Sequence, residues 1–315
     1  MRSRFRTDRR LAVRMTVTLF LLGLVYVAFV AALIVLLKSW LLVVVIIAAM
    51  FVAQFWFSDR IAMFAMRGRV VEREEYPELH AVVDRLCAIA DMPKPVIAVS
   101  TMDMPNAFAT GRNPDHAVVC VTTGLLRRLE PAELEGVLAH ELSHVAHKDV
   151  AVITIASFLG VLAGLIVRFA FYSQIFGGRK DQNTAVVFAA VMGVSAAVYA
   201  ISFLLIRALS RYRELAADRA AAQLTGRPSA LASALTKVSG DIARIPTKDL
   251  RTAQAFNAFY FTPATGKEPG IERFFSTHPP LEERLEQLGR ISAELGEAAL
   301  PGNGSGSGTG SGKAG

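Results

Sequence analysis

Four long apolar runs constrain this chain more than any other feature of its sequence. A stretch of about 17 to 25 apolar residues can cross the hydrocarbon core of a bilayer as a helix. The hydrophobic fraction of 53% and the mean hydropathy of +0.40 both exceed the norm for a soluble globular protein. The sequence therefore predicts a mainly α-helical membrane protein with four transmembrane helices, over Thr16–Leu37, Leu41–Phe57, Val150–Val167 and Ala185–Ile206.

The four runs form two pairs. The first two are separated only by Lys38, Ser39 and Trp40, which predicts a helical hairpin. The first run exceeds the usual apolar length of a signal peptide, so an uncleaved anchor is expected. The later two runs are joined by the polar segment Ser173–Thr184 and fit either membrane spans or buried core helices.

The positive charge is explained by membrane topology. The net charge of the chain is +7. A cluster of six arginines lies directly before the first span, at Arg2, Arg4, Arg6, Arg9, Arg10 and Arg14. Basic residues at such a position set a cytoplasmic orientation and meet anionic lipid, and no stacking aromatics are interleaved for nucleic acid. Two spans return the chain to the cytoplasm, so we expect the bilayer as a partner and no nucleic acid.

The pentapeptide His140-Glu141-Leu142-Ser143-His144 is the strongest functional signal. On a helix its two imidazoles lie one turn apart on the same face, with a carboxylate beside them. The two nitrogens can hold zinc, while Glu141 can take a proton from water on the metal. A helix whose first turn contains Pro131 would hold these groups rigidly. The motif predicts hydrolysis, most often of a peptide bond.

A catalytic zinc needs a third protein ligand, and the best candidate follows the fourth apolar run. Glu214 and Asp218 are four residues apart and share a helix face. Glu214 could bind the metal while Asp218 orients a ligand histidine. Alternatively, both acids pair with neighbouring arginines on a solvated face. If the third and fourth runs both span, Glu214 returns to the side of His144. Asp149 could orient a ligand or cap the membrane helix.

The region between the second span and the motif has ordinary globular composition. We expect a helix over Tyr76–Met92, a strand over Val96–Ser100, turns over Asn106–Asp115 and a second strand over Ala117–Thr122. The last strand is either an exposed edge that binds substrate or an ordinary buried strand. The two cysteines, Cys87 and Cys120, have no metal-ligand spacing and are expected in the core.

These motifs jointly resemble the HtpX family of bacterial membrane zinc peptidases, which are relatives of the CAAX prenyl proteases. The resemblance runs from the first span to about Leu288. Position 215 is Leu where many relatives have an aromatic residue. The segments that carry the resemblance are His140–His144 with Asp149, Arg211–Asp218, Ser276–Pro280 and Met104–Ala109.

The resemblance implies a gluzincin-like α+β zinc endopeptidase domain on the cytoplasmic side of the bacterial cytoplasmic membrane. It implies one zinc ion per chain, held by His140, His144 and Glu214, with Glu141 as general base. Its substrates would be damaged or misfolded membrane proteins in quality control. His278 either helps to hold the active-site cleft or stabilise an oxyanion, or it belongs to a structural turn before the helix from Leu281.

Two other functions fit the sequence less well than a quality-control protease. A CAAX-type prenyl-protein endoprotease would need more membrane helices to enclose a chamber than this chain offers. A membrane adaptor with a structural metal site would need four protein ligands, whereas three candidates are found. The sequence favours the quality-control protease.

The predicted organisation alternates membrane and peptidase segments. A basic tail and a hairpin come first, and the peptidase domain is divided by the second pair of spans. The tail is almost wholly Gly and Ser, so it is expected to be disordered. The segments are 1–14, the basic tail; 15–58, the hairpin; 59–149 and 208–298, the two parts of the peptidase domain; 150–207, the second pair of spans; and 299–315, the Gly- and Ser-rich tail.

Overall fold

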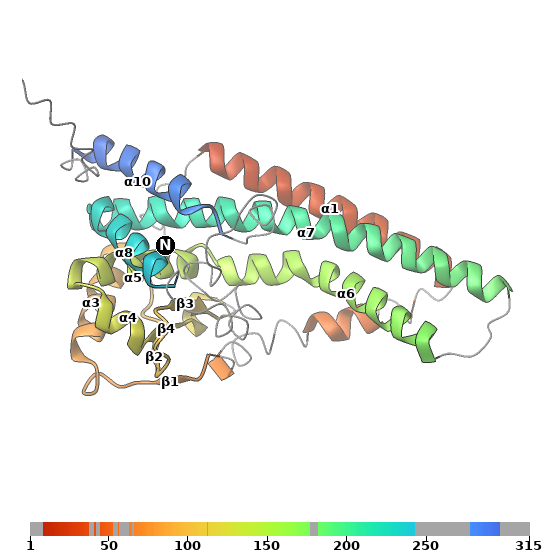
Figure 1. The fold of residues 1–315 in the computed structure, drawn as a ribbon, viewed down its shortest axis with the longest axis horizontal. Helices are drawn as coiled ribbons and strands as arrows, with labels where there is room; N and C mark the ends of the chain where they lie inside the picture. The colour runs from red at the N-terminus through yellow and green to blue at the C-terminus, as the bar shows by residue number, and fades with distance from the viewer. Residues whose placement is uncertain are drawn as a thin grey trace, which may run out of the picture.

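The computed structural model places a globular domain at one end of a group of long helices (Figure 1). The predicted second span, Leu41–Phe57, lies partly outside the described residues, and the Gly- and Ser-rich tail lies wholly outside them. The structure describes residues 9–37, 41, 45–52, 56, 63–64, 66–111, 113–176, 182–242 and 278–296.

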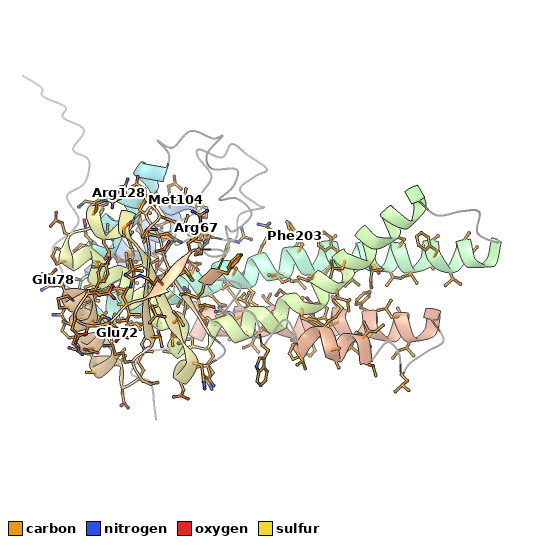
Figure 2. All side chains as sticks on the ribbon, turned by 90° about the horizontal axis from the view of Figure 1, so that it is seen from below. Arg67, Glu72, Glu78, Met104, Arg128 and Phe203 are labelled. Atoms are coloured by element: carbon orange, nitrogen blue, oxygen red, sulfur yellow. The ribbon has the colours of Figure 1, made fainter. Side chains whose placement is uncertain are left out.

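Three long helices run side by side away from the globular domain. They are α1 (Arg9–Leu37), α6 (Asp149–Phe176) and α7 (Gln182–Thr225). Among the described residues, two helices are long and apolar enough to cross a membrane, within α1 and α7, while α6 carries a shorter apolar segment. In Figure 2, Phe203 lies along α7, away from the labelled side chains of the globular domain.

Helix α7 is longer than a bilayer requires. Its 44 residues extend over about 66 Å at 1.5 Å per residue, roughly twice the hydrocarbon thickness. The apolar run Ala185–Ile206 accounts for the first half, and the second half continues without a break into the globular domain. One continuous helix therefore joins the membrane region to the part of the chain that carries Glu214.

Small and polar residues bring the long helices close together. A Cβ built on Gly160 of α6 would lie 3.1 Å from the Cβ of Ser202 on α7, so the two backbones approach closely there. Tyr26 of α1 donates a 2.5 Å hydrogen bond to the carbonyl oxygen of Ala156 on α6. These contacts join all three helices through their buried faces.

The globular domain contains a four-stranded sheet. Its strands are β1 (Gly68–Val70), β2 (Val96–Ser100), β3 (Ala107–Thr110) and β4 (Val118–Thr122), in the order β1-β2-β4-β3. Strands β2 and β4 are parallel, and the other two pairs are antiparallel.

The structure corrects one strand assignment. The segment predicted as turns over Asn106–Asp115 contains β3, and this strand forms the edge of the sheet. The strand proposed as an exposed edge, Ala117–Thr122, corresponds to β4 and lies in the interior between β2 and β3. Four residues of β3 are too few for the alternating pattern that reveals longer strands.

Helices cover the sheet and enclose one core. They are α3 (Pro77–Ala90), α4 (Thr123–Arg128), α5 (Pro131–Ala146), α8 (Pro228–Ile242) and α10 (Leu281–Leu295), whereas the short 3-10 helix η1 (Pro114–His116) has no buried residue. Both cysteines lie in this core, as predicted, and burial raises the pKa of Cys87 to about 11 and of Cys120 to about 12. Neither thiol is therefore reactive near neutral pH.

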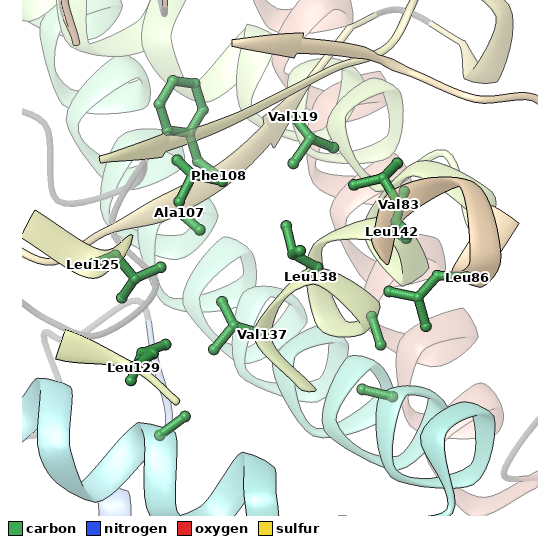
Figure 3. Close-up of a cluster of buried hydrophobic side chains, with 14 of the residues drawn as sticks. Val83, Leu86, Ala107, Phe108, Val119, Leu125, Leu129, Val137, Leu138 and Leu142 are labelled. Atoms are coloured by element: carbon green, nitrogen blue, oxygen red, sulfur yellow. The ribbon is translucent and has the colours of Figure 1, made fainter. Parts of the chain in front are cut away.

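Helix α5 lies at the centre of this core. It begins at Pro131, as predicted, and the backbone N–H of Glu130 donates to the Glu133 side chain, which fixes the first turn. Val137, Leu138 and Leu142 are fully buried; in Figure 3, Leu138 and Leu142 lie toward Val119 of the sheet and Val83 of α3, and Val137 lies toward Leu125 and Leu129. Because α5 is packed on several sides, the side chains that it carries are held in fixed positions.

Candidate metal centre

Three potential metal ligands converge where α5 crosses α7. His140 and His144 come from α5, and Glu214 comes from the second half of α7. The two Nε2 atoms are 3.2 Å apart, and the Glu214 carboxylate oxygens lie 3.6 Å from His140 Nε2 and 3.5 Å from His144 Nε2. The structure thus brings Glu214 to the pentapeptide, although α6 and the first part of α7 intervene in the chain.

The spacing of these three groups fits a metal ion. Ligand atoms about 2.0–2.1 Å from a shared tetrahedral ion are about 3.4 Å from one another, close to the three distances found here. Both Nδ1 atoms face carboxylates, so in the neutral rings the proton is on Nδ1 and Nε2 presents a lone pair. Two lone pairs and a carboxylate that face each other at this distance repel unless a metal ion or a shared proton lies between them, and the three groups can hold a metal ion.

Glu141 is buried beside the three converging groups. It is only 4% exposed and receives a backbone hydrogen bond from Ala109 of the edge strand β3. Burial raises its pKa, although the neighbouring imidazoles partly oppose this shift. A carboxylate with a raised pKa is better suited to accept and return a proton near neutral pH.

Each histidine is backed by a carboxylate, and each carboxylate by an arginine. His140 Nδ1 lies 2.9 Å from Asp218 Oδ1, and Arg284 donates to Asp218 from Nη2 at 2.6 Å and from Nε at 2.7 Å. Burial opposes protonation of His140, but the nearby acids Asp218 and Glu214 outweigh it and raise the pKa of His140. The surroundings of this ring are therefore strongly negative.

The second histidine has an equivalent arrangement. His144 Nδ1 is hydrogen bonded to Asp149 Oδ2 at 2.6 Å, and Arg213 Nη2 lies 2.7 Å from the same oxygen. Arg213 also donates through Nη1 to the Asp149 backbone oxygen at 2.6 Å. Asp149 is the first residue of α6, so the partner of His144 is fixed to the start of a long apolar helix.

His278 lies at the same site. It precedes α10, is 6% exposed, and its Nδ1 is 3.1 Å from Glu214 Oε2. The structure therefore brings all seven residues that the sequence singled out to one place. The alternative in which Glu214 and Asp218 lie on a solvated face does not fit, because both are buried.

Two functional neighbours were not identified from the sequence. The sequence pattern offers the arginines beside Glu214 and Asp218 only as partners on a solvated face, and it does not indicate Arg284. Arg213 is instead 4% exposed and pairs with Asp149, while Arg284 is 1% exposed and pairs with Asp218. Arg213 directly precedes the candidate ligand Glu214, and this adjacency is the sequence signal by which Arg213 could have been found.

The two histidines of a helical pentapeptide and a glutamate from a later helix define a metallopeptidase. Comparison with known proteins narrows this class. The chain belongs to peptidase family M48, which it matches over residues 73–292.

Relatives in this family share almost the whole chain. The chain is 85% identical over 302 residues to "Protease HtpX homolog 1" of Streptomyces coelicolor, covering 96% of this chain and 99% of the relative. It is 50% identical to "Protease HtpX homolog" of Moorella thermoacetica, covering 94% and 99%. The predicted HtpX resemblance is confirmed, and the chain is a membrane metalloendopeptidase.

A solved structure has a similar fold. The crystal structure of S. mikatae Ste24p superposes with a TM-score of 0.51 at 18% identity, over 89% of this chain and 66% of that one. The likeness shows that the arrangement of long helices and peptidase domain recurs at low sequence identity.

Proposed function

We propose that the chain is a zinc-dependent endopeptidase of the bacterial cytoplasmic membrane, with four spans and its active site facing the cytoplasm. We propose that it cleaves damaged or misfolded membrane proteins. The single observation that carries the zinc peptidase role is the convergence of His140, His144 and Glu214, with atoms 3.2–3.6 Å apart, beside the buried Glu141.

The proposed ligands are the Nε2 atoms of His140 and His144 and the carboxylate of Glu214. When bound, zinc supplies a Lewis acid that acidifies water and polarises a carbonyl group. Asp218 and Asp149 accept from the Nδ1 side of the two rings, which keeps both Nε2 lone pairs directed at the ion. His, His and Glu suit zinc better than the harder divalent cations.

Glu141 is the proposed general base. Its carboxylate accepts a proton from the attacking water and then delivers that proton to the nitrogen of the leaving amine. The peptide bond breaks between its carbonyl carbon and this nitrogen, so two chain ends are released. Burial of Glu141 excludes bulk water from the proton transfer and keeps its pKa raised.

The edge strand β3 is the proposed substrate platform. Its outer edge is not paired within the described sheet, and Ala109 on this strand contacts Glu141 through a backbone hydrogen bond. An extended peptide can add to such an edge through main-chain hydrogen bonds, which do not depend on sequence. This mode of binding suits a protease that acts on unfolded segments of many proteins.

His278 is the proposed stabiliser of the oxyanion that forms when water attacks the carbonyl. It lies 3.1 Å from Glu214 Oε2 and so borders the position of the reacting carbonyl. A positioned imidazole N–H can donate to developing negative charge there. Alternatively, His278 belongs only to a structural turn before α10. The His278→Ala variant described below distinguishes these two roles.

Aromatic and basic residues support the proposed membrane boundary. The guanidinium of Arg14 on α1 lies 5.8 Å from the ring centroid of Tyr212 on α7, and that of Arg207 lies 3.9 Å from the ring of Phe203. Such residues are typical of the membrane–water interface, and basic ones of the cytoplasmic side. Arg207 and Tyr212 lie on the part of α7 that follows the apolar run and precedes Glu214, and Phe203 lies near the end of that run.

The experiment uses purified full-length protein in proteoliposomes, loaded with zinc. Glu141→Gln is compared with Glu286→Gln, which makes the same change at an exposed residue of α10. We expect Glu141→Gln to bind zinc normally and to lose at least about 100-fold in cleavage of an unfolded membrane protein, while Glu286→Gln cleaves normally. Undiminished cleavage by Glu141→Gln would overturn its role.

The substrate class and His278 are tested in the same preparation. A prenylated peptide is offered beside the unfolded membrane protein, and preferential cleavage of the peptide would contradict the quality-control role. His278→Ala is expected to lower kcat more than it raises KM. An unchanged kcat with reduced stability would show that His278 is only structural.

A further inference from the structure

We propose that Arg213 is a positioning residue for the metal site, through which the packing of the membrane helices α6 and α7 sets the orientation of His144. The inference rests on the proposed role of His144 as a metal ligand. Arg213 does not touch the ligand atoms that converge on the proposed metal. It holds Asp149 instead, and Asp149 orients the imidazole of His144.

The contacts of Arg213 enclose Asp149 from two directions. One guanidinium nitrogen lies 2.7 Å from Asp149 Oδ2, the same oxygen to which His144 Nδ1 is hydrogen bonded. Another donates to the Asp149 backbone oxygen at 2.6 Å. Side chain and main chain of Asp149 are thus both fixed, so the carboxylate cannot rotate away from His144 without breaking a charged hydrogen bond.

The three residues belong to three different helices. His144 is near the end of α5, Asp149 begins α6, and Arg213 lies on α7 next to the ligand Glu214. A shift of α6 relative to α7 would therefore move Asp149 away from Arg213 or pull the carboxylate away from His144. The relative position of these two helices is fixed in turn where Gly160 packs against Ser202.

Arg213 and Asp149 depend on each other because both are buried. Their side chains are 5% and 9% exposed, so neither charge has water as an adequate substitute partner. Arg284 backs His140 in the same way but from α10 of the globular domain. Of the two arginines, only Arg213 comes from a helix that also contains a membrane segment.

The first experiment measures zinc affinity by chelator competition, together with unfolding of the metal-free protein. Partners of zinc ligands typically change metal affinity about 10–100-fold, so we expect Arg213→Met to weaken zinc binding at least about 10-fold. Arg213→Lys should recover part of this loss, and Arg219→Gln, an arginine of the same helix paired with Glu294 at the surface, should have no effect.

A double variant separates positioning from general destabilisation. In an Asp149→Ala background, Arg213→Met should cause little further loss of zinc affinity, because its target is gone. If Arg213→Met lowers only the stability of the metal-free protein and leaves zinc affinity unchanged, the positioning role is overturned. If the wild-type protein itself does not bind zinc, the proposed function fails instead.

The second experiment tests the link to helix packing. Gly160→Val places a branched side chain against Ser202, whereas a Cβ at Gly193 of α7 meets nothing within 4 Å, so Gly193→Val is the matched control. We expect Gly160→Val to weaken zinc binding and Gly193→Val to leave it unchanged. In an Arg213→Met background, Gly160→Val should add little. Unchanged zinc affinity in Gly160→Val, or losses that multiply in the double variant, would overturn the link.

Discussion

Arg284 of α10 donates two hydrogen bonds to Asp218 of α7, directly behind the imidazole of His140. Helix α10 follows His278 in the chain, so a helix late in the chain completes the surroundings of the proposed metal ligands His140 and His144. Gln287 strengthens this docking through a 2.7 Å hydrogen bond to the Leu215 backbone oxygen.

Removal of Arg284 should destabilise the protein more than removal of any surface arginine. Arg284→Met leaves the fully buried Asp218 without its charged partner, which costs about 3–5 kcal/mol for a broken buried pair. Arg290→Met, on the exposed side of the same helix, should change stability by less than about 0.5 kcal/mol. Chemical unfolding in detergent measures both, and equal effects would contradict the importance of this pair.

Loss of Glu214 should release the metal. Glu214→Ala removes one of three proposed ligands, so zinc affinity should fall by more than the roughly 100-fold that loss of a ligand's partner can cause. Elemental analysis of the purified protein after dialysis should show little zinc, against one ion per chain in the wild type. A full complement of zinc in Glu214→Ala would refute its role as a ligand.

The buried Glu133 should make stability depend on pH. Burial alone would raise its pKa, but hydrogen bonds from Lys237 and Ser233 outweigh burial and lower the pKa of this carboxyl. A carboxyl whose pKa falls on folding stabilises the fold above its unfolded pKa of about 4.3, and this contribution is lost as the pH falls through the folded pKa.

The corresponding measurement compares unfolding free energies of the wild type and Glu133→Gln between pH 3 and 7. The difference should be largest near pH 6 and should shrink as the pH falls below about 4. Glu74→Gln, an exposed position in a turn, should show a small difference throughout. A difference for Glu133→Gln that grows toward acid would contradict the lowered pKa.

Gly124 should tolerate no side chain. A Cβ there would lie 1.9 Å from the backbone oxygen of Asp103, in the segment that leads into β3. Gly124→Ala should therefore displace this segment, lose about 1–3 kcal/mol of stability and slow cleavage by shifting the edge strand. Gly289→Ala, where nothing lies within 4 Å on α10, should be neutral or stabilising by about 0.4–1 kcal/mol. Calorimetry and a peptidase assay distinguish the two.

Local patterns in the sequence were sufficient for part of the fold. Strand β2 covers the predicted residues, Val96–Ser100, and α5 begins at the predicted Pro131. Both have a local cause, because β-branched residues favour a strand and proline is suited to a first turn. The four-residue strand β3 has no comparable local signal, so its place at the sheet edge became evident only in three dimensions.

In the candidate site, too, some features follow from local sequence and others depend on how distant helices pack. The spacing within the pentapeptide and between Glu214 and Asp218 follows from helix geometry, and both could be read from the sequence. The partners of Asp149 and Asp218 could not, because a buried carboxylate's choice among the chain's arginines depends on how distant helices pack. Arg213 and Arg284 therefore became recognisable only through their contacts with these two acids.

Because α7 is uninterrupted, it sets how far from the bilayer a peptide bond must lie for the enzyme to reach it. If the bilayer ends near Ile206, the eight-residue advance to Glu214 sets the proposed metal site about 12 Å along the helix axis from the lipid. A rigid helix keeps that height constant. Folded domains are too bulky to enter so shallow a gap, whereas a loop or tail that has just left the membrane is already at the right level.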